Sequence, residues 1–137
     1  TFSPNAADAL VIPGGFGAAK NLSSYAFDGP KCKVHPDVAK AIKDMHACGK
    51  PIGALCIAPV LVAKVLGKVS LTIGDDQATA DNLVAMGATH VPTSHGQIAI
   101  DRENKIVTTP CYMLNSRVDQ VAEGADNLIR AMLEMMA

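Results

Sequence analysis

The sequence predicts an α/β domain with a mostly parallel β-sheet that helices cover on both faces. Short apolar runs that end at glycine or proline alternate with longer amphipathic stretches, which is the order of strand–helix repeats. A late antiparallel hairpin is predicted from 97–101 and 105–109, because both segments alternate apolar and polar residues around the polar turn 102–104. The length of 137 residues fits one domain and is too short for two.

The composition narrows the possible functions. Apolar residues make up 49% of the chain and charged residues 18%, which is typical of a globular domain and not of a disordered one. A net charge of −1, the lack of a basic run and an aromatic content of 4% argue against a nucleic-acid partner. Membrane insertion is not expected, because the apolar runs fall short of the roughly 18 residues that a membrane-spanning helix needs.

The four cysteines, Cys32, Cys48, Cys56 and Cys111, form no CxxC pair. Zinc sites commonly contain such pairs, so we expect no zinc site, and nothing else in the sequence calls for a metal or a cofactor. A chain this apolar can build a core without disulfides, and we therefore expect free thiols in a reducing compartment.

The first part of the chain predicts a strand, a loop and a helix. Residues 9–12 form a short apolar strand, which the sequence Pro-Gly-Gly at 13–15 stops. Gly17 and Asn21 favour a loop before any helix begins. A helix is predicted over 36–48, since proline opens it, apolar residues recur on one stripe and glycine follows it.

The rest of the chain continues the alternation of strands and helices. A strand that starts at 50 ends at Cys56, and a helix follows it at once over 59–66. A strand, a helix and a short strand come next, at 69–73, 78–86 and 90–91. The last helix is predicted over 113–136. Its buried stripe is expected to consist of Val118, Val121, Ala122, Ala125, Leu128, Ile129 and Met132.

Cys56 stands where a predicted strand runs directly into a helix. The sharp turn at such a junction projects the side chain at the carboxyl edge of the sheet, where α/β folds place their sites. Unpaired N–H groups at the helix start favour a thiolate and can stabilise an oxyanion. Small residues at Gly53, Ala54 and Ala58 permit the turn. A buried structural cysteine is the alternative, because this small, soft side chain also fills cores.

A glycine-rich turn, Pro13-Gly14-Gly15-Phe16-Gly17, follows the first predicted strand. Glycine lets the backbone approach a ligand and turn an N–H towards it. A phosphate-binding loop is disfavoured, because the sequence has neither the Walker-type lysine with serine or threonine nor the GxGxxG spacing. A plain strand-ending turn is the alternative for this segment.

Four segments, taken together and in order, resemble one known family: VIPGGFGAAKNLS (11–23), GKPIGALCIAP (49–59), LTIG (71–74) and NKIVTTPCYM (104–113). They resemble the ElbB-like family, in the PfpI branch of the class I glutamine amidotransferase-like superfamily. The resemblance implies a flavodoxin-like three-layer sandwich with Cys56 on a nucleophile elbow. It also implies that the backbone N–H groups of Gly15 and Ile57 form an oxyanion pocket.

The resemblance further implies an activity and a location. ElbB-like bacterial proteins are linked to a weak glyoxalase III activity, which converts 2-oxoaldehydes to hydroxy acids without glutathione, and eukaryotic relatives are largely mitochondrial. We therefore expect a cytoplasmic protein if the source is bacterial and a mitochondrial matrix protein if it is eukaryotic. Relatives commonly form dimers, so a homodimer or a part of a larger assembly is expected.

The chain departs from this family in two respects. Many PfpI relatives have histidine directly after the nucleophile, whereas this chain has Ile57, which cannot take a proton. The family's first strands, which supply a glutamate beside the cysteine, match no segment here. We therefore expect residues 1–137 to be a single class I glutamine amidotransferase-like domain, limited to its C-terminal two-thirds and incomplete at its N-terminal side.

Two of the four histidines, His95 and His46, are candidates for a base that replaces the missing one. His95 is the foremost, because it lies in a loop before the hairpin that could approach the carboxyl edge of the sheet. His46 is expected near solvent on the helix at 36–48. His35 and His90 are expected to be surface or capping residues, and the four histidines are too scattered to predict a metal site.

Asp75 and Asp76 follow the strand at 69–73 and were expected at the same sheet edge as Cys56. One of them could orient a substrate or a base, but two acids before a helix more commonly serve the helix N-terminus. Cys111 is expected to be a packing residue. Tyr112 could reach a pocket, although a tyrosine beside a methionine before a helix more commonly closes a core.

Two functional hypotheses follow. In the first, the Cys56 thiolate adds to the aldehyde carbon of a small 2-oxoaldehyde while the two backbone donors hold the oxyanion, so the partner is a small carbonyl substrate. In the second, the protein is a non-catalytic binding or assembly protein or a cysteine-based redox sensor, which Ile57 and the missing acid motivate. Glutaminase-type amide transfer is weaker, because it requires a Cys-His-Glu triad.

Overall fold

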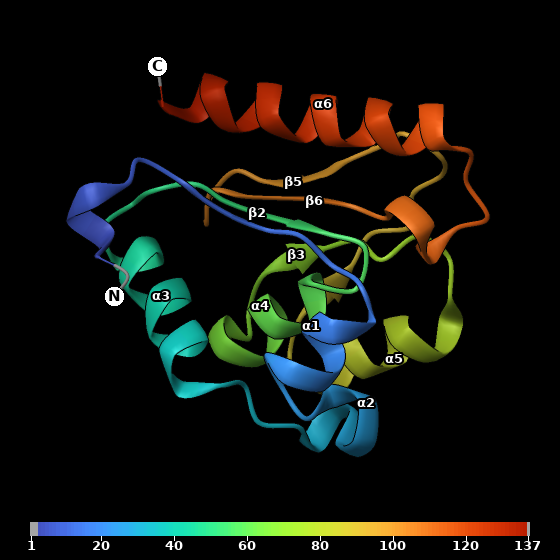
Figure 1. Ribbon diagram of the computed structural model, residues 1–137, viewed down its shortest axis with the longest axis horizontal. Coiled ribbons are helices and arrows are strands. Elements are labelled where there is room, and N and C mark those ends of the chain that lie inside the picture. Colours follow the sequence, from blue (N-terminus) through green and yellow to red (C-terminus); the bar gives the residue numbers. More distant parts are fainter. Residues whose placement is uncertain (1–2, 137) are drawn as a thin grey trace.

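The computed structural model of the protein describes residues 3–136 and has three layers (Figure 1). A four-stranded sheet forms the middle layer. The long C-terminal helix α6 (Val118–Met136) lies along one face of this sheet, and the shorter helices lie on the other side. This arrangement confirms the predicted α/β class and its flavodoxin-like three-layer organisation.

The strands of the main sheet follow the order β1-β2-β6-β5. β1 (Leu10–Ile12), β2 (Ile52–Leu55) and β6 (Ile106–Thr109) are parallel, whereas β5 (Ala99–Asp101) is antiparallel to β6. The β5–β6 pair is the predicted hairpin. The mostly parallel sheet with one antiparallel pair is therefore confirmed.

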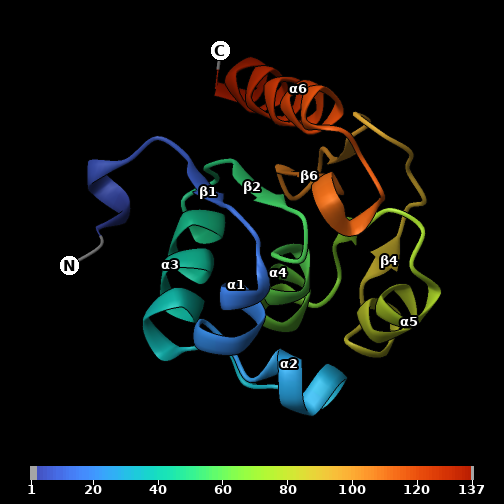
Figure 2. The same cartoon turned by 45° about the vertical axis from the view of Figure 1, so that its right-hand side comes forward.

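One predicted strand takes a different place from the one expected. Within 69–73 only β3 (Ser70–Leu71) is extended, and it pairs with β4 (Thr89–His90) in a separate two-stranded parallel sheet. Figure 2 shows β4 beside α5, apart from β2 and β6. The segment still contacts the main sheet, because the N–H of Thr72 donates to the Thr108 hydroxyl at 3.0 Å.

Three predicted helices are confirmed, with ends within one residue of those expected: α3 (Pro36–Ala47), α4 (Pro59–Leu66) and α5 (Gln77–Ala85). Proline occupies the first turn of α3 and of α4, where its missing N–H leaves no bond unmade. Gly49 follows α3 with a φ of 68°, the left-handed conformation that glycine adopts most easily after a helix.

The segment after the glycine-rich turn is helical, and the expectation of a loop was wrong. It forms α1 (Phe16–Asn21) and α2 (Tyr25–Asp28). Ala18 and Ala19 are buried, and the Ser23 hydroxyl is directed at their two carbonyl oxygens at 3.3 Å. Burial of these small residues outweighs the weak helix preference of glycine and asparagine.

α6 begins at Val118, five residues later than the predicted start at 113. The 3-10 turn Cys111–Met113 comes first, and Leu114 is then extended. The Leu114 side chain is buried against Gly74, so tertiary packing holds this stretch out of the helix.

The buried stripe of α6 also differs from the expected one. Leu128 and Met132 face the sheet as predicted, together with Gly124 and Ala131. Three residues that were expected to be buried are exposed: Val118, Ala122 and Ile129. α6 is thus rotated about its axis relative to the predicted orientation. Gly124 explains this rotation, because its lack of a side chain lets the helix approach β6 closely.

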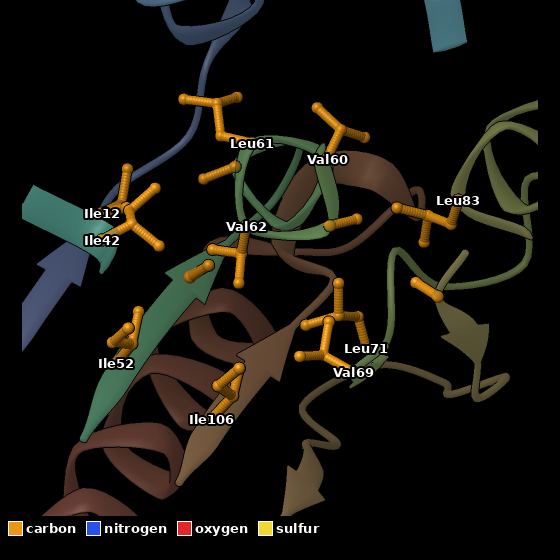
Figure 3. Close-up of a cluster of buried hydrophobic side chains, with 14 of the residues drawn as sticks. Ile12, Ile42, Ile52, Val60, Leu61, Val62, Val69, Leu71, Leu83 and Ile106 are labelled. Carbon is orange, nitrogen blue, oxygen red and sulfur yellow. The ribbon is translucent and has the colours of Figure 1, made fainter. Parts of the chain in front are cut away.

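The main hydrophobic core lies between the sheet and the helices on the side of α4. Figure 3 shows Ile52 of β2 and Ile106 of β6 on the same side as Val62 of α4 and Leu71 of β3, and all four are fully buried. A smaller cluster, which includes Val107 and Leu128, packs α6 against the opposite face. β2 is therefore held on both faces, and the turn that follows it has a rigid base.

No helix among residues 3–136 combines the length and the apolar character needed to cross a membrane.

Candidate active site

Cys56 occupies the predicted strand-to-helix turn. β2 ends at Leu55, residues 56–58 form the turn, and α4 begins at Pro59. Cys56 has a φ of 61°, a left-handed conformation that is uncommon for a residue with a side chain and typical of a nucleophile elbow. Its N–H donates to the carbonyl oxygen of Thr109 at 3.0 Å, so β6 fixes the start of the turn.

The glycine-rich turn lies directly against this elbow. A Cβ added to Gly14 would come within 2.4 Å of the Leu55 carbonyl oxygen, 2.6 Å of the Cys56 Cβ and 2.9 Å of the Ile57 nitrogen. The close backbone approach therefore requires glycine at position 14. Gly15 has a φ of 121° and precedes the first residue of α1, so the chain turns sharply beside Cys56.

A cavity of about 230 Å³ lies between the two turns, and the half-buried Cys56 is part of its wall. Its lining residues are Gly15, Phe16, Ala19, Cys56, Ile57 and Met113. Apart from the Cys56 thiol, these side chains are apolar and none can carry a proton. The cavity therefore offers a nucleophile and backbone donors within an apolar wall.

Gly15 and Ile57, the two predicted oxyanion donors, both line this cavity. Among residues 3–136, neither backbone N–H donates a hydrogen bond to another protein group. In contrast, the next N–H, that of Ala58, donates to the Leu55 carbonyl oxygen at 3.0 Å. Both N–H groups are thus free of protein acceptors, and their use as an oxyanion pocket stays a prediction.

Cys111 lies next to the elbow, which the sequence did not indicate. It is buried, as expected of a packing residue, but it also has a φ of 46°. Burial raises the pKa of the Cys111 thiol, and the neighbouring Cys56 adds to this rise. Two free thiols therefore lie near each other at the candidate site.

His95 does not line the cavity at Cys56. It is exposed on the loop between β4 and β5, and its Nδ1 is 2.6 Å from the hydroxyl of Ser116. His46 is half-buried on α3. Its Nε2 lies 3.0 Å from Asn104 in the turn before β6, at the sheet edge opposite to Cys56.

The other weighed residues have structural roles. His35 caps α3, because its Nδ1 accepts the N–H of Asp37 at 3.2 Å. Asp76 caps α5 by accepting the N–H of Thr79 at 3.0 Å, and this bond together with the Thr79 hydroxyl lowers the pKa of the carboxyl group. Burial lowers the pKa of His90, which favours the neutral ring. None of the three lines the cavity at Cys56.

Three cavity residues, Phe16, Ala19 and Met113, were not predicted as site residues. Phe16 and Ala19 belong to α1, and an amphipathic reading of 16–21 would have placed them on a helix that starts at the glycine-rich turn. Met113 follows β6, which is parallel to β2, so its segment leaves the sheet at the same edge as Cys56. Tyr112 is 60% exposed and does not close a core.

Within residues 3–136, no group of three or more histidine, cysteine or acidic side chains lies close enough to hold a metal ion. A larger groove of about 390 Å³ runs along β1 and α3, but Asp37 is its only ionisable lining residue. Its wall is otherwise apolar and includes Leu10, Val11 and Ile12. The smaller cavity, in contrast, has the Cys56 thiol in its wall.

A parallel sheet between helical layers, with a cysteine on the turn after a central strand, is the arrangement of the class I glutamine amidotransferase-like fold. An isoprenoid biosynthesis protein with an amidotransferase-like domain from Ehrlichia chaffeensis has the same fold, with a TM-score of 0.86 and 33% sequence identity over 97% of this chain and 61% of its own. This chain belongs to the class I glutamine amidotransferase-like superfamily.

Two proteins with similar sequences have names that fit this superfamily. The human glutamine amidotransferase-like class 1 domain-containing protein 3, mitochondrial, is 43% identical over 93% of this chain. The rat ES1 protein homolog, mitochondrial, is 41% identical over the same share. The chain covers 51% and 52% of these two relatives, so it spans about half their length.

More distant proteins share the fold alone. The Rapid Encystment Protein of 24 kDa from Francisella tularensis superposes with a TM-score of 0.70 at 17% identity, over 99% of this chain and 61% of its own. No protein-family model matches the chain.

Proposed function

We propose that this domain carries a nucleophilic cysteine, Cys56, that acts on a small 2-oxoaldehyde and produces the corresponding 2-hydroxy acid without glutathione. The observation that carries the proposal is the position of Cys56 on a strained elbow, in the wall of a small cavity that two free backbone N–H groups also line. A cavity of about 230 Å³ is large enough for a three-carbon oxoaldehyde.

The first step is addition of the Cys56 thiolate to the aldehyde carbon. A carbon–sulfur bond forms, and the carbonyl π electrons move to the oxygen, which gives a hemithioacetal oxyanion. The N–H groups of Gly15 and Ile57, which line the same cavity, stabilise this oxyanion, because preorganised donors aimed at a developing charge lower the energy of the transition state. Removing one such donor typically costs a factor of about 100 to 1,000 in rate.

The second step moves hydrogen within the substrate. The proton on the former aldehyde carbon leaves and the neighbouring carbon gains one, so that the aldehyde carbon is oxidised, the ketone carbon is reduced and a thioester remains on Cys56. Water then hydrolyses the thioester and releases the 2-hydroxy acid and the thiol. The net reaction consumes one 2-oxoaldehyde and one water, with no external oxidant or reductant.

The proton transfer needs a group that the cavity wall at Cys56 does not contain, since its lining side chains other than Cys56 are apolar. Family resemblance suggests a glutamate from a part of the domain that no segment of residues 1–137 matches. The proposal therefore assigns the nucleophile and the oxyanion donors to this chain, and it assigns the proton carrier to another part of the whole protein.

Turnover of methylglyoxal to lactate by the full-length protein tests the proposal. Cys56→Ser is expected to reduce lactate formation to the uncatalysed background. Cys48→Ser is the matched control, because Cys48 is exposed at the end of α3 and lies outside the cavity wall. Lactate formation at the same rate in the Cys56→Ser variant and the wild type would refute the assignment.

A non-catalytic role is the second candidate, and the apolar wall around Cys56 favours it, because no base contacts the thiol there. In this role the protein binds a partner or records oxidation.

Two relatives are named mitochondrial, and we propose a mitochondrial location for this chain if its source is eukaryotic. We also keep the ElbB-like, PfpI-type assignment and the homodimer as proposals.

A further inference from the structure

Cys111 has a buried thiol that the proposed chemistry does not use, and it lies beside the candidate nucleophile Cys56. β2 and β6 lie side by side in the sheet (Figure 1). They are parallel, and Leu55 pairs with Thr109 at their carboxyl ends. Cys56 is one residue beyond this last pair and Cys111 is two residues beyond it. Both cysteines therefore leave the sheet at the same edge, from adjacent strands.

The distance between adjacent strands suits a disulfide. Neighbouring strands lie about 4.8 Å apart, and a disulfide joins Cα atoms that are roughly 4.4–6.8 Å apart. Because the Cys56 N–H donates to Thr109, the two strand ends do not splay at this point. The spacing at the sheet edge is thus within the range that one disulfide spans.

Both cysteines also lie on sharp backbone turns just beyond the ends of their strands. Cys56 and Cys111 both have a positive φ, 61° and 46°, which bends each chain sharply as it leaves its strand. This left-handed conformation costs a residue with a side chain roughly 1–2 kcal/mol, so contacts with the surrounding structure must stabilise both turns. Cys111 also lies close enough to Cys56 for the neighbouring thiol to help raise the pKa of its own thiol.

The two thiols differ in environment in a way that divides their roles. Cys56 is half-buried in the wall of the cavity, where a small oxidant can reach it. Cys111 is buried, and burial raises the pKa of its thiol, so it stays protonated and is shielded from direct oxidation. One thiol is placed to react first, and the other is placed to react with the product.

We propose that Cys111 is the resolving thiol of Cys56, so that peroxide converts the pair into a Cys56–Cys111 disulfide. The Cys56 sulfur first attacks a peroxide, the O–O bond breaks, and a sulfenic acid forms with release of water or an alcohol. The Cys111 sulfur then attacks the Cys56 sulfur, so that an S–S bond forms, the S–O bond breaks and the Cys111 proton leaves in a second water. Two thiols lose two electrons in total, and the peroxide gains them.

This disulfide removes the nucleophile reversibly and protects it. A sulfenic acid without a resolving thiol is oxidised further to a sulfinic acid, which ordinary thiols do not reduce. The disulfide is reduced by a dithiol, which restores Cys56. The inference concerns the sulfur chemistry alone and goes beyond the proposed activity on oxoaldehydes, so a failure of either proposal leaves the other standing.

Mass spectrometry of the full-length protein after treatment with hydrogen peroxide tests the inference. Free thiols are blocked, the protein is digested with trypsin without reduction, and disulfide-linked peptides are identified. Trypsin does not cut between Lys50 and Pro51, so Cys48 and Cys56 share the peptide 44–64, whereas Cys111 lies in 106–117. The Cys48→Ser variant is therefore measured beside the wild type to make the assignment unique.

The expected result is a linked peptide of 44–64 with 106–117, in the wild type and in Cys48→Ser, that disappears after treatment with dithiothreitol. In Cys111→Ser the link is absent, and the peptide 44–64 gains two oxygens that its fragment ions assign to Cys56, which marks a sulfinic acid at that residue. The wild-type measurement decides by itself if that variant does not fold. Sulfinic acid on Cys56 of the wild type without the linked peptide would overturn the inference, and so would a link from Cys56 to Cys32 or Cys48.

Discussion

Gly14 and Cys56 are in direct backbone contact, although 41 residues separate them in the chain and they follow two different strands. A Cβ at position 14 would lie 2.6 Å from the Cys56 Cβ and 2.4 Å from the Leu55 carbonyl oxygen. The Cys56 Cβ and the Leu55 carbonyl oxygen are both fixed by the backbone, so neither can move away without a shift of the main chain. This contact holds the glycine-rich turn against the turn that carries Cys56.

The first prediction concerns this contact. Gly14→Ala is expected to lower the free energy of unfolding by roughly 1–3 kcal/mol, the usual cost of overpacking, and to abolish Cys56-dependent activity because the two turns must separate. Urea denaturation and turnover measure the two effects.

Gly17→Ala is the matched control, because a Cβ there meets only the Asn21 side chain, at 3.7 Å. Within a helix, replacing glycine by alanine is expected to be neutral or stabilising by up to about 1 kcal/mol. Equal stability of Gly14→Ala and Gly17→Ala would contradict the close approach.

His95→Ala is predicted to leave turnover within about twofold of the wild type. His95 is exposed, its Nδ1 is hydrogen-bonded to Ser116, and it does not line the cavity at Cys56. The measurement is kcat/KM for methylglyoxal as a function of pH. A loss of two orders of magnitude, with one limb of the pH profile removed, would instead make His95 the base.

Asp101 stabilises the junction of the two sheets by accepting the backbone N–H of Ser70 at 2.8 Å and that of Asn104 at 3.0 Å. Asp101→Asn is predicted to cost about 1–3 kcal/mol, because an amide cannot accept on both sides and leaves a partly buried N–H unpaired. Denaturation at neutral pH measures this cost. The exposed Asp126→Asn, whose partner Arg130 is also on the surface, should cost far less.

The contribution of Asp101 should also depend on pH. Burial alone would raise the pKa of its carboxyl group, but the hydrogen bonds from Asn104, Ser70 and Glu103 together outweigh burial and hold the pKa below its usual value. A lowered folded-state pKa stabilises the protein above the unfolded-state pKa of about 3.9, and this stability is lost as the pH falls through the folded-state pKa. The stability difference between wild type and Asp101→Asn should therefore shrink below about pH 4, and a difference that is constant down to pH 2 would count against the assignment.

Leu128→Ala and Leu133→Ala form a matched pair on α6. Leu128 is fully buried against the sheet, whereas Leu133 is 55% exposed. The first change should cost about 2–5 kcal/mol through lost burial and a cavity, and the second should cost less than about 1 kcal/mol. Chemical denaturation measures both. The orientation of α6 would be wrong if Leu133→Ala were the more damaging of the two.

Local signals in the sequence predicted the elements that place Cys56. A short apolar run, a cysteine and a proline three residues later mark β2, the turn and α4, because strand, elbow and first helical turn each have a distinct residue preference. The hairpin of β5 and β6 was predictable for the same reason, since its alternation and its polar turn are both local.

Features that depend on distant contacts could not be predicted in this way. α1 forms because Ala18 and Ala19 are buried by other elements, and β3 pairs with β4 outside the main sheet although nothing in its own residues excludes the main sheet. The rotation of α6 follows from the space that Gly124 leaves beside Thr109. Cys111 and Met113 reach the candidate site only because β6 ends next to β2.

The central claim is that the Cys56 thiol is accessible from the cavity and that the thiols of Cys32 and Cys111 are sealed. Alkylation of the native, full-length Cys48→Ser variant with iodoacetamide, followed peptide by peptide, tests it most directly. We predict that 44–64 becomes modified at Cys56 while Cys32 and Cys111 react only after denaturation. If Cys56 also stayed unmodified until the protein was denatured, neither the carbonyl chemistry nor the peroxide chemistry could take place.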